Sequence, residues 1–254
     1  MEIDPRAPYP LMQSPQLART IAAMGGHARF LQIGPSQALI LRRFGLSMVS
    51  RPMGGNAQTY RALAAEGVRV INANQTDGLH AAGFRQIMTP ATLTVLELNA
   101  GRRSRMQGKW RNRLMAANGS VTARPYANDD WLIAADQAQQ RARRYRGWPA
   151  HFTAAYAATN PDDTLMVQSA DAAMLFLIHG SAASYHIGIT GPEGRETHAH
   201  NLLLDHAATL LAERGCKWID LGTIDTDANP GLARFKLGSG ARALRTGGTW
   251  LRLL

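Results

Sequence analysis

The chain has 254 residues, a length that suits one large domain or two small fused ones and allows a sizeable core. Its net charge of +10 favours an anionic partner, such as tRNA, coenzyme A, a phosphorylated precursor or an anionic membrane surface. No apolar run approaches the roughly 20 residues of a transmembrane helix, and no signal-peptide pattern is present, so we expect a cytoplasmic protein. The single cysteine, Cys216, excludes an internal disulfide.

Arginine dominates the basic residues: of the 28 lysines and arginines, only Lys109, Lys217 and Lys236 are lysine. A biased genome would also produce this excess, so the charge alone does not define a partner. Where arginine is the default cation, however, a retained lysine indicates a position that requires a compact ammonium group.

The first third of the chain has the pattern of a small α+β unit. Turn signals at Gly34-Pro35 and Gly45 separate three short strand-like stretches. In chain order we expect a helix at 15–26, strands at 28–33, 38–43 and 46–51, a helix at 57–66, and strands at 68–72 and 92–98.

Two helices are expected next, at 101–118 and 129–146. In the first, the i, i+3 and i+4 spacing predicts an apolar face beside a basic stripe. The apolar face is Met106, Trp110, Leu114 and Ala117, and the stripe is Arg102, Arg105, Lys109 and Arg113. The stripe is interpreted either as the edge of a substrate cleft or as an ordinary solvated face.

From residue 163 the pattern is clearer. It predicts strands at 165–168, 172–179 and 182–190, a long helix at 198–214, a strand at 218–221, a short helix near 230–237, and strands at 241–245 and 249–253. This β-β-β-α-β-α-β-β order is an α+β plan with one crossover helix on a mixed sheet.

Three segments make this plan specific: KWRNRL at 109–114, AASYHIG at 182–188, and WIDLGTIDTDANPGLARFKLGSGA at 218–241. Together they resemble the Fem-like (FemAB-related) branch of the GNAT acyltransferase superfamily, over about residues 90–254. The resemblance implies a GNAT-type mixed, mostly antiparallel sheet flanked by helices. It also implies a reduced GNAT-like N-terminal lobe, residues 1–98, before a C-terminal acyltransferase lobe, residues 99–254.

The resemblance further implies site residues. The Phe-Lys pair of such enzymes lies at the transfer site, which here indicates Phe235 and Lys236, with the lysine stabilising charge on the donor or the tetrahedral intermediate. Basic residues of the KWRNRL-type helix face an anionic substrate, which indicates Lys109, Arg111 and Arg113. The Tyr185-His186 pair falls on the strand that splays from its neighbour to admit the acyl arm.

The loop before the long helix departs from the superfamily pattern. Enzymes that use acetyl-CoA usually carry an Arg/Gln-x-x-Gly-x-Gly/Ala loop, whose backbone amides hold the pyrophosphate. This chain reads TGPEGRETHAHN there, with Gly191 and Gly194 but no such motif. The departure favours aminoacyl-tRNA over acyl-CoA as the donor co-substrate and leaves an atypical coenzyme A site open.

The expected reaction is transfer of an activated acyl or aminoacyl group to a primary amine on a small molecule or precursor, without a tightly bound cofactor. It requires positioning of both substrates, an oxyanion donor such as Lys236, and a proton acceptor. Candidate acceptors are Asp220, Asp225, His186 and His198, and the sequence does not choose among them. Asp225 and His198 are also candidate substrate contacts, together with Tyr185.

Several of these residues also have a structural interpretation. Lys236 also fits a solvated helix residue, Asp220 a turn cap, and His186 a structural histidine. The His-x-His at His198 has no carboxylate or cysteine at ligand spacing, so no metal site is expected. Serine-hydrolase and P-loop motifs are lacking. The alternatives are an acyl-CoA-dependent N-acetyltransferase and a non-catalytic RNA- or anion-binding module of GNAT fold.

Overall fold

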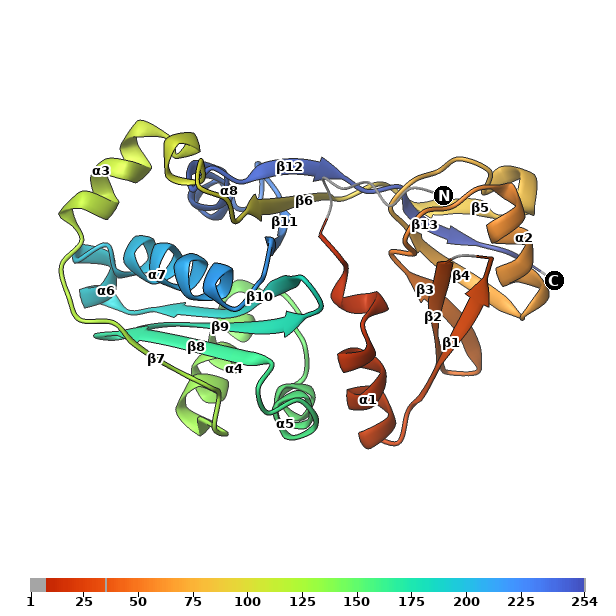
Figure 1. The fold of residues 1–254 in the computed structure, drawn as a ribbon, viewed down its shortest axis with the longest axis horizontal. Helices are drawn as coiled ribbons and strands as arrows, with labels where there is room; N and C mark the ends of the chain where they lie inside the picture. The colour runs from red at the N-terminus through yellow and green to blue at the C-terminus, as the bar shows by residue number, and fades with distance from the viewer. Residues whose placement is uncertain (1–7, 35, 254) are drawn as a thin grey trace.

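The computed structural model describes residues 8–34 and 36–253, which form two sheets that lie side by side with helix α1 (Pro15–Ala23) between them (Figure 1). Within these ranges the N-terminal sheet has strand order β1-β2-β3-β4-β13-β5 and the C-terminal sheet has order β12-β6-β11-β10-β9-β8-β7. Most neighbouring strands are antiparallel. The expected α+β class with mixed, mostly antiparallel sheets is therefore confirmed.

The N-terminal sheet begins as an antiparallel meander of β1 (His27–Ile33), β2 (Ser36–Arg43) and β3 (Leu46–Ser50), as the turn signals predict. Helix α2 (Ala57–Ala65) then connects β3 to the parallel strand β4 (Val68–Ala73). Apolar side chains of the sheet and helix pack into one core, including Val49, Leu63, Ile71, Phe84 and Trp250.

The chain crosses between the two sheets in a way that the sequence does not indicate. Strand β13 (Gly248–Leu251), at the end of the chain, pairs with β4 and β5 (Arg85–Met88) in the N-terminal sheet. Strand β6 (Thr92–Glu97) pairs with β11 and β12 (Arg242–Arg245) in the C-terminal sheet. The N-terminal sheet thus includes β13 from the end of the chain, and the C-terminal sheet includes β6 from before residue 98. The expected division into domains after residue 98 stays a prediction.

The C-terminal sheet is built on β9 (Ala172–His179), which is buried along its whole length. It pairs with β10 (Ala182–Thr190) on one side and β8 (Thr164–Ser169) on the other, and β7 (Thr122–Arg124) pairs with β8 at the edge of the sheet. Helix α7 (Ala199–Glu213) covers one face, and α4 (Asp130–Arg143) and α5 (Ala150–Thr159) cover the other (Figure 1).

Strand β11 (Trp218–Ile224) returns after α7 to lie parallel to β10, so α7 is the expected crossover helix. The two strands pair only between 182–184 and 218–220. Beyond this point β10 has an irregularity between Tyr185 and Ile187, and β11 has one between Asp220 and Gly222. The parallel strands therefore separate, and helix α8 (Pro230–Gly238) follows β11 on that side.

The expected helix at 101–118 is wrong in its extent. The segment forms a short 3₁₀ turn, η3 (Arg103–Arg105), and then α3 (Gly108–Ala116). Arg102 is buried, and its Nη1 lies 2.7 Å from Oδ1 of Asp205 on α7, which also pairs with Arg103. Both guanidinium groups thus pair with this buried carboxylate where the chain turns, and Arg102 does not share a helical stripe with Lys109 and Arg113.

The sequence pattern also missed several short elements. These are α5, α6 (Pro192–Glu196), β5, β7, η1 (Leu11–Gln13) and η2 (His80–Ala82). Among residues 8–34 and 36–253, no helix has the length and apolar character needed to span a bilayer.

Candidate active site

The side chain of Lys236 lies where β10 and β11 separate. Helix α8 presents Lys236 toward β11, where its Nζ donates a hydrogen bond to the Thr223 carbonyl oxygen at 2.8 Å. The residue is only 5 % exposed. Gly222, at φ +78, directly follows the irregularity in β11, and a Cβ there would lie 3.6 Å from Nζ. The lysine that sequence composition singled out is therefore a buried cation beside a bent strand.

The burial of Lys236 changes its acidity. Desolvation lowers its pKa to about 8, and the negative charge of Asp220 opposes this fall. An ammonium ion with one carbonyl partner in a buried position is well suited to stabilise a negative charge that forms beside it.

Asp220 is held by an ion pair that joins the two sheets. Its Oδ2 lies 2.5 Å from Nη1 of Arg51, which immediately follows β3, and its Oδ1 accepts a hydrogen bond from the Gly222 amide at 2.8 Å. The side chain of Arg51 is 16 % exposed, and that of Asp220 is 8 % exposed. Arg51 has a left-handed backbone, at φ +55, and its Nε donates to Oδ1 of Asn74 at 3.3 Å. Both carboxylate oxygens of Asp220 are thus engaged.

A histidine and a serine adjoin this pair. His179, at the end of β9, is fully buried, and its Nε2 lies 2.8 Å from Oγ of Ser184 on β10. Ser184 is the strand partner of Asp220. Burial lowers the pKa of His179 to about 4, so the ring is neutral near pH 7. We refer to Arg51, His179, Ser184, Asp220 and Lys236 as the junction cluster.

Two further residues implied by the resemblance, Phe235 and Tyr185, are sequence neighbours of cluster residues Lys236 and Ser184. The ring centroid of Phe235 is 6.2 Å from that of Trp110 and 5.8 Å from that of His200, so Phe235 joins α3, α7 and α8. Tyr185 packs against Phe176 at 5.7 Å, and burial raises its pKa.

His186 contacts a different helix. Its Nε2 lies 2.8 Å from Oγ1 of Thr153 on α5, and its ring is 5.9 Å from Phe152. Burial lowers the pKa of His186 to about 4, which makes it a weak base. Its catalytic role stays a prediction, and its contacts fit the structural alternative equally well.

The other predicted residues lie at the surface or in loops. Lys109 and Arg113 are exposed on α3, whereas Arg111 donates to the backbone carbonyls of Ser104 and Met106 at 3.3 Å and 3.1 Å. The Asp225 carboxylate accepts hydrogen bonds from the amides of Asp227 and Ala228, which lower its pKa. His198 is half-buried at the start of α7 with φ +55.

The loop between β10 and α7 encloses a carboxylate of the protein itself. Asp171, from the turn between β8 and β9, accepts hydrogen bonds from the amides of Gly194 at 2.6 Å and Glu193 at 3.2 Å. A Cβ on Gly191 would overlap the same carboxylate. Amides that open the short helix α6, in the segment where acetyl-CoA enzymes bind pyrophosphate, are therefore already occupied by an anion.

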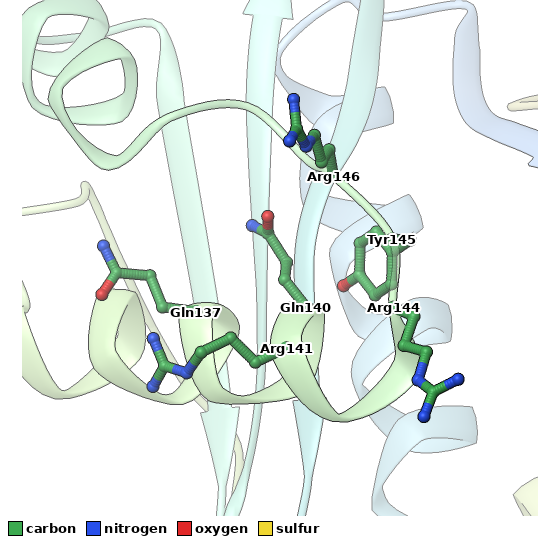
Figure 2. A pocket seen from close by; sticks show the side chains of 6 residues that line it. All are labelled: Gln137, Gln140, Arg141, Arg144, Tyr145 and Arg146. Carbon is green, nitrogen blue, oxygen red and sulfur yellow. The ribbon is translucent and has the colours of Figure 1, made fainter.

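An open pocket of about 450 Å³ lies at the C-terminal end of α4 (Figure 2). The amide of Gln139, on the same helix, donates to the Gly188 carbonyl oxygen at 3.2 Å, so this end of α4 is attached to the splayed part of β10. The pocket adds positive charge beside that strand. It is lined by Gln137, Gln140, Arg141, Arg144, Tyr145 and Arg146.

Sequence reasoning found Lys236 and Asp220 but missed Arg51, His179 and Asp171. The partner of Asp220 is 169 positions away, in the other sheet, and no local pattern indicates such a pairing. The one signal for Arg51 is its position directly after an apolar strand and before Pro52.

The splayed parallel strands, the crossover helix and the mixed sheet define a GNAT-type fold, and solved structures of Fem-like and related proteins have a similar fold. The structure most informative for comparison is that of FemX, with a TM-score of 0.76, 14% identity, and coverage of 99% of this chain and 94% of that one. The C-terminal domain of a putative lysylphosphatidylglycerol synthetase from Agrobacterium fabrum has a TM-score of 0.59, 13% identity, and coverage of 95% and 89%. The resemblance drawn from the sequence is thereby confirmed at the level of the fold.

A third similar structure is L-PGS from Bacillus licheniformis, with a TM-score of 0.53, 14% identity, and coverage of 96% of this chain and 94% of that one. No protein-family model and no curated protein matches the sequence.

The ion pair between the sheets is open to a direct stability test. Replacing Arg51 with Met leaves the Asp220 carboxylate buried without its cation, so Arg51→Met should lower the free energy of unfolding by about 3–5 kcal/mol. Adding Asp220→Leu should restore most of that loss. Denaturant unfolding followed by circular dichroism measures both.

The matched control is Arg29→Met, which breaks the 2.8 Å pair with Glu66, whose two side chains are 51 % and 44 % exposed. That change should cost no more than about 1 kcal/mol. Equal costs for the two arginine variants would contradict a structural role for the buried pair.

Proposed function

We propose that this protein is an N-acyltransferase that moves an aminoacyl group from aminoacyl-tRNA to a primary amine at the junction cluster. The observation that carries the proposal is the placement of Lys236, a buried ammonium group beside the splayed strands β10 and β11. An ester carbonyl held at this opening would develop its negative charge within reach of that ammonium group.

The chemistry needs no covalent enzyme intermediate, because the ester is already activated. The amine nitrogen attacks the carbonyl carbon, and the oxyanion of the tetrahedral intermediate is stabilised by Lys236. The bond from that carbon to the ribose oxygen then breaks as the amide forms. The amine loses one proton and the leaving ribose oxygen takes one up, so the step balances without an added acid.

Asp220 supports this step as a positioning group. Its oxygens are engaged by Arg51 and the Gly222 amide, which leaves it poorly placed to accept a proton. Its negative charge opposes the loss of the proton from Lys236 and so keeps the ammonium form available near neutral pH.

The choice of donor rests on Asp171 and on the charge of the chain. A coenzyme A pyrophosphate would have to compete with the Asp171 carboxylate for the amides of Glu193 and Gly194. Transfer RNA requires no such loop and is favoured by the net charge of +10 and by the arginines at the end of α4.

The central test replaces Lys236 and measures turnover. In a transfer assay with aminoacyl-tRNA, Lys236→Met should lower kcat by about 10²–10³ with a smaller change in KM. Lys236→Arg should also lose most turnover, because the wide guanidinium does not fit the space of an ammonium group. Lys217→Met, a lysine on the exposed surface before β11, is the matched control and should retain activity. Turnover at the wild-type rate in folded Lys236→Met would remove this residue from the mechanism.

A binding experiment tests the donor. Wild-type protein should bind tRNA with an affinity that falls steeply as salt rises, and acetyl-CoA with a Kd no tighter than about 1 mM. Calorimetry with Asp171→Asn then asks whether the carboxylate is what keeps coenzyme A out. Tight, saturable acetyl-CoA binding by the wild type, without tRNA binding, would reverse the order of donors and favour the acyl-CoA-dependent enzyme.

A further inference from the structure

The turn between β2 and β3 exposes an aromatic ring at a position whose backbone conformation disfavours a bulky side chain. Arg43 and Leu46 close a two-residue hairpin turn whose central residues, Phe44 and Gly45, have φ values of +50 and +77. Two positive φ values are typical of a type I′ turn, where Asn-Gly is preferred. A bulky side chain at the first position strains the backbone.

The phenylalanine ring gains little from packing in return. Phe44 is 87 % exposed, and its one aromatic contact is with the Arg43 guanidinium, 4.8 Å above the ring. Leu46, next in the turn, is 48 % exposed. An aromatic residue that strains the turn and buries little of its surface indicates a role in contact with something outside the molecule.

Other side chains at this end of the N-terminal sheet are also exposed apolar groups or arginines. The register places the start of β4 and the end of β13 beside the start of β3, and Leu253, just after β13, is 76 % exposed. Basic residues surround these apolar groups, and the acidic residue just before β4, Glu66, is paired with Arg29. The arginines of this end are Arg42, Arg43, Arg69, Arg85 and Arg252.

We propose that this end of the N-terminal sheet, with the Phe44 turn at its tip, docks on an anionic lipid surface. An exposed aromatic and two leucines would enter the interface between headgroups and acyl chains, and the arginines would contact the anionic headgroups. The turn lies at the opposite end of β3 from Arg51, about 20 Å from the junction cluster, so docking leaves the site open. The Arg43–Phe44 arrangement and the charge around it favour a membrane over a neutral apolar protein partner.

The test measures co-sedimentation of the full chain with vesicles of phosphatidylcholine, alone or with about 30 mol% phosphatidylglycerol. The wild type should bind the anionic vesicles and bind the neutral ones weakly. Phe44→Asn should lose about tenfold in affinity for the anionic vesicles while its melting temperature stays the same or rises, because asparagine relieves the turn. Arg42→Gln with Arg43→Gln should remove the preference for anionic vesicles.

The matched control is Met115→Gln, which removes an 81 % exposed apolar side chain from α3 and should bind as the wild type does. Three results would overturn the proposal. The first is that the wild type does not bind anionic vesicles. The second is that Phe44→Asn binds them as well as the wild type does, which would indicate that binding depends on net charge alone. The third is that the chain self-associates through the turn and does not bind vesicles.

Discussion

The ion pair between Arg51 and Asp220 connects the two sheets at the point where the C-terminal sheet opens. Two opposite charges with little exposure are stable there only while both are present, because either alone would be a buried charge without a partner. Asp220 in turn opposes the fall in the pKa of Lys236. The packing of the N-terminal sheet against the C-terminal one therefore holds in place the one charge that opposes the desolvation of the lysine at the centre of the proposed site.

The path of the chain enforces this packing. Strand β13 returns to the N-terminal sheet after β12 has paired with β6 in the other, so the last residues close the core around Trp250. Helix α1 adds a second connection: Arg19 donates to the Asn160 side chain after α5 at 2.7 Å. The junction cluster has residues from both sheets, so the distances within it depend on how firmly the two sheets are held together. Connections between the sheets are therefore needed to keep its geometry constant.

Local pattern was sufficient for most of the fold. Alternation and turn residues predicted β1 to β3, and the Gly-Leu-x-x-Phe-Lys segment placed Lys236 on a short helix after a strand, as observed. What local pattern could not predict were the tertiary partners. The buried Arg102–Asp205 pair lies where the expected helix at 101–118 is interrupted. Strand β13 inserts between β4 and β5, which are far away in the sequence, and Arg51 meets Asp220 only in the folded chain. The roles of the site residues stay proposals.

The most direct measurement of the central claim is the titration of the lysine side chains by NMR, in protein carrying isotope-labelled lysine. The chain has only Lys109, Lys217 and Lys236, so each signal can be assigned by substitution. One signal should titrate with a midpoint of about 8 and disappear in Lys236→Met, and Asp220→Asn should lower that midpoint further, because the opposing negative charge is lost. A titration of Lys236 at the ordinary lysine pKa of about 10.4 would show that the lysine is not desolvated, and an unchanged midpoint in Asp220→Asn would show that it is not coupled to the ion pair; either result contradicts the proposed site.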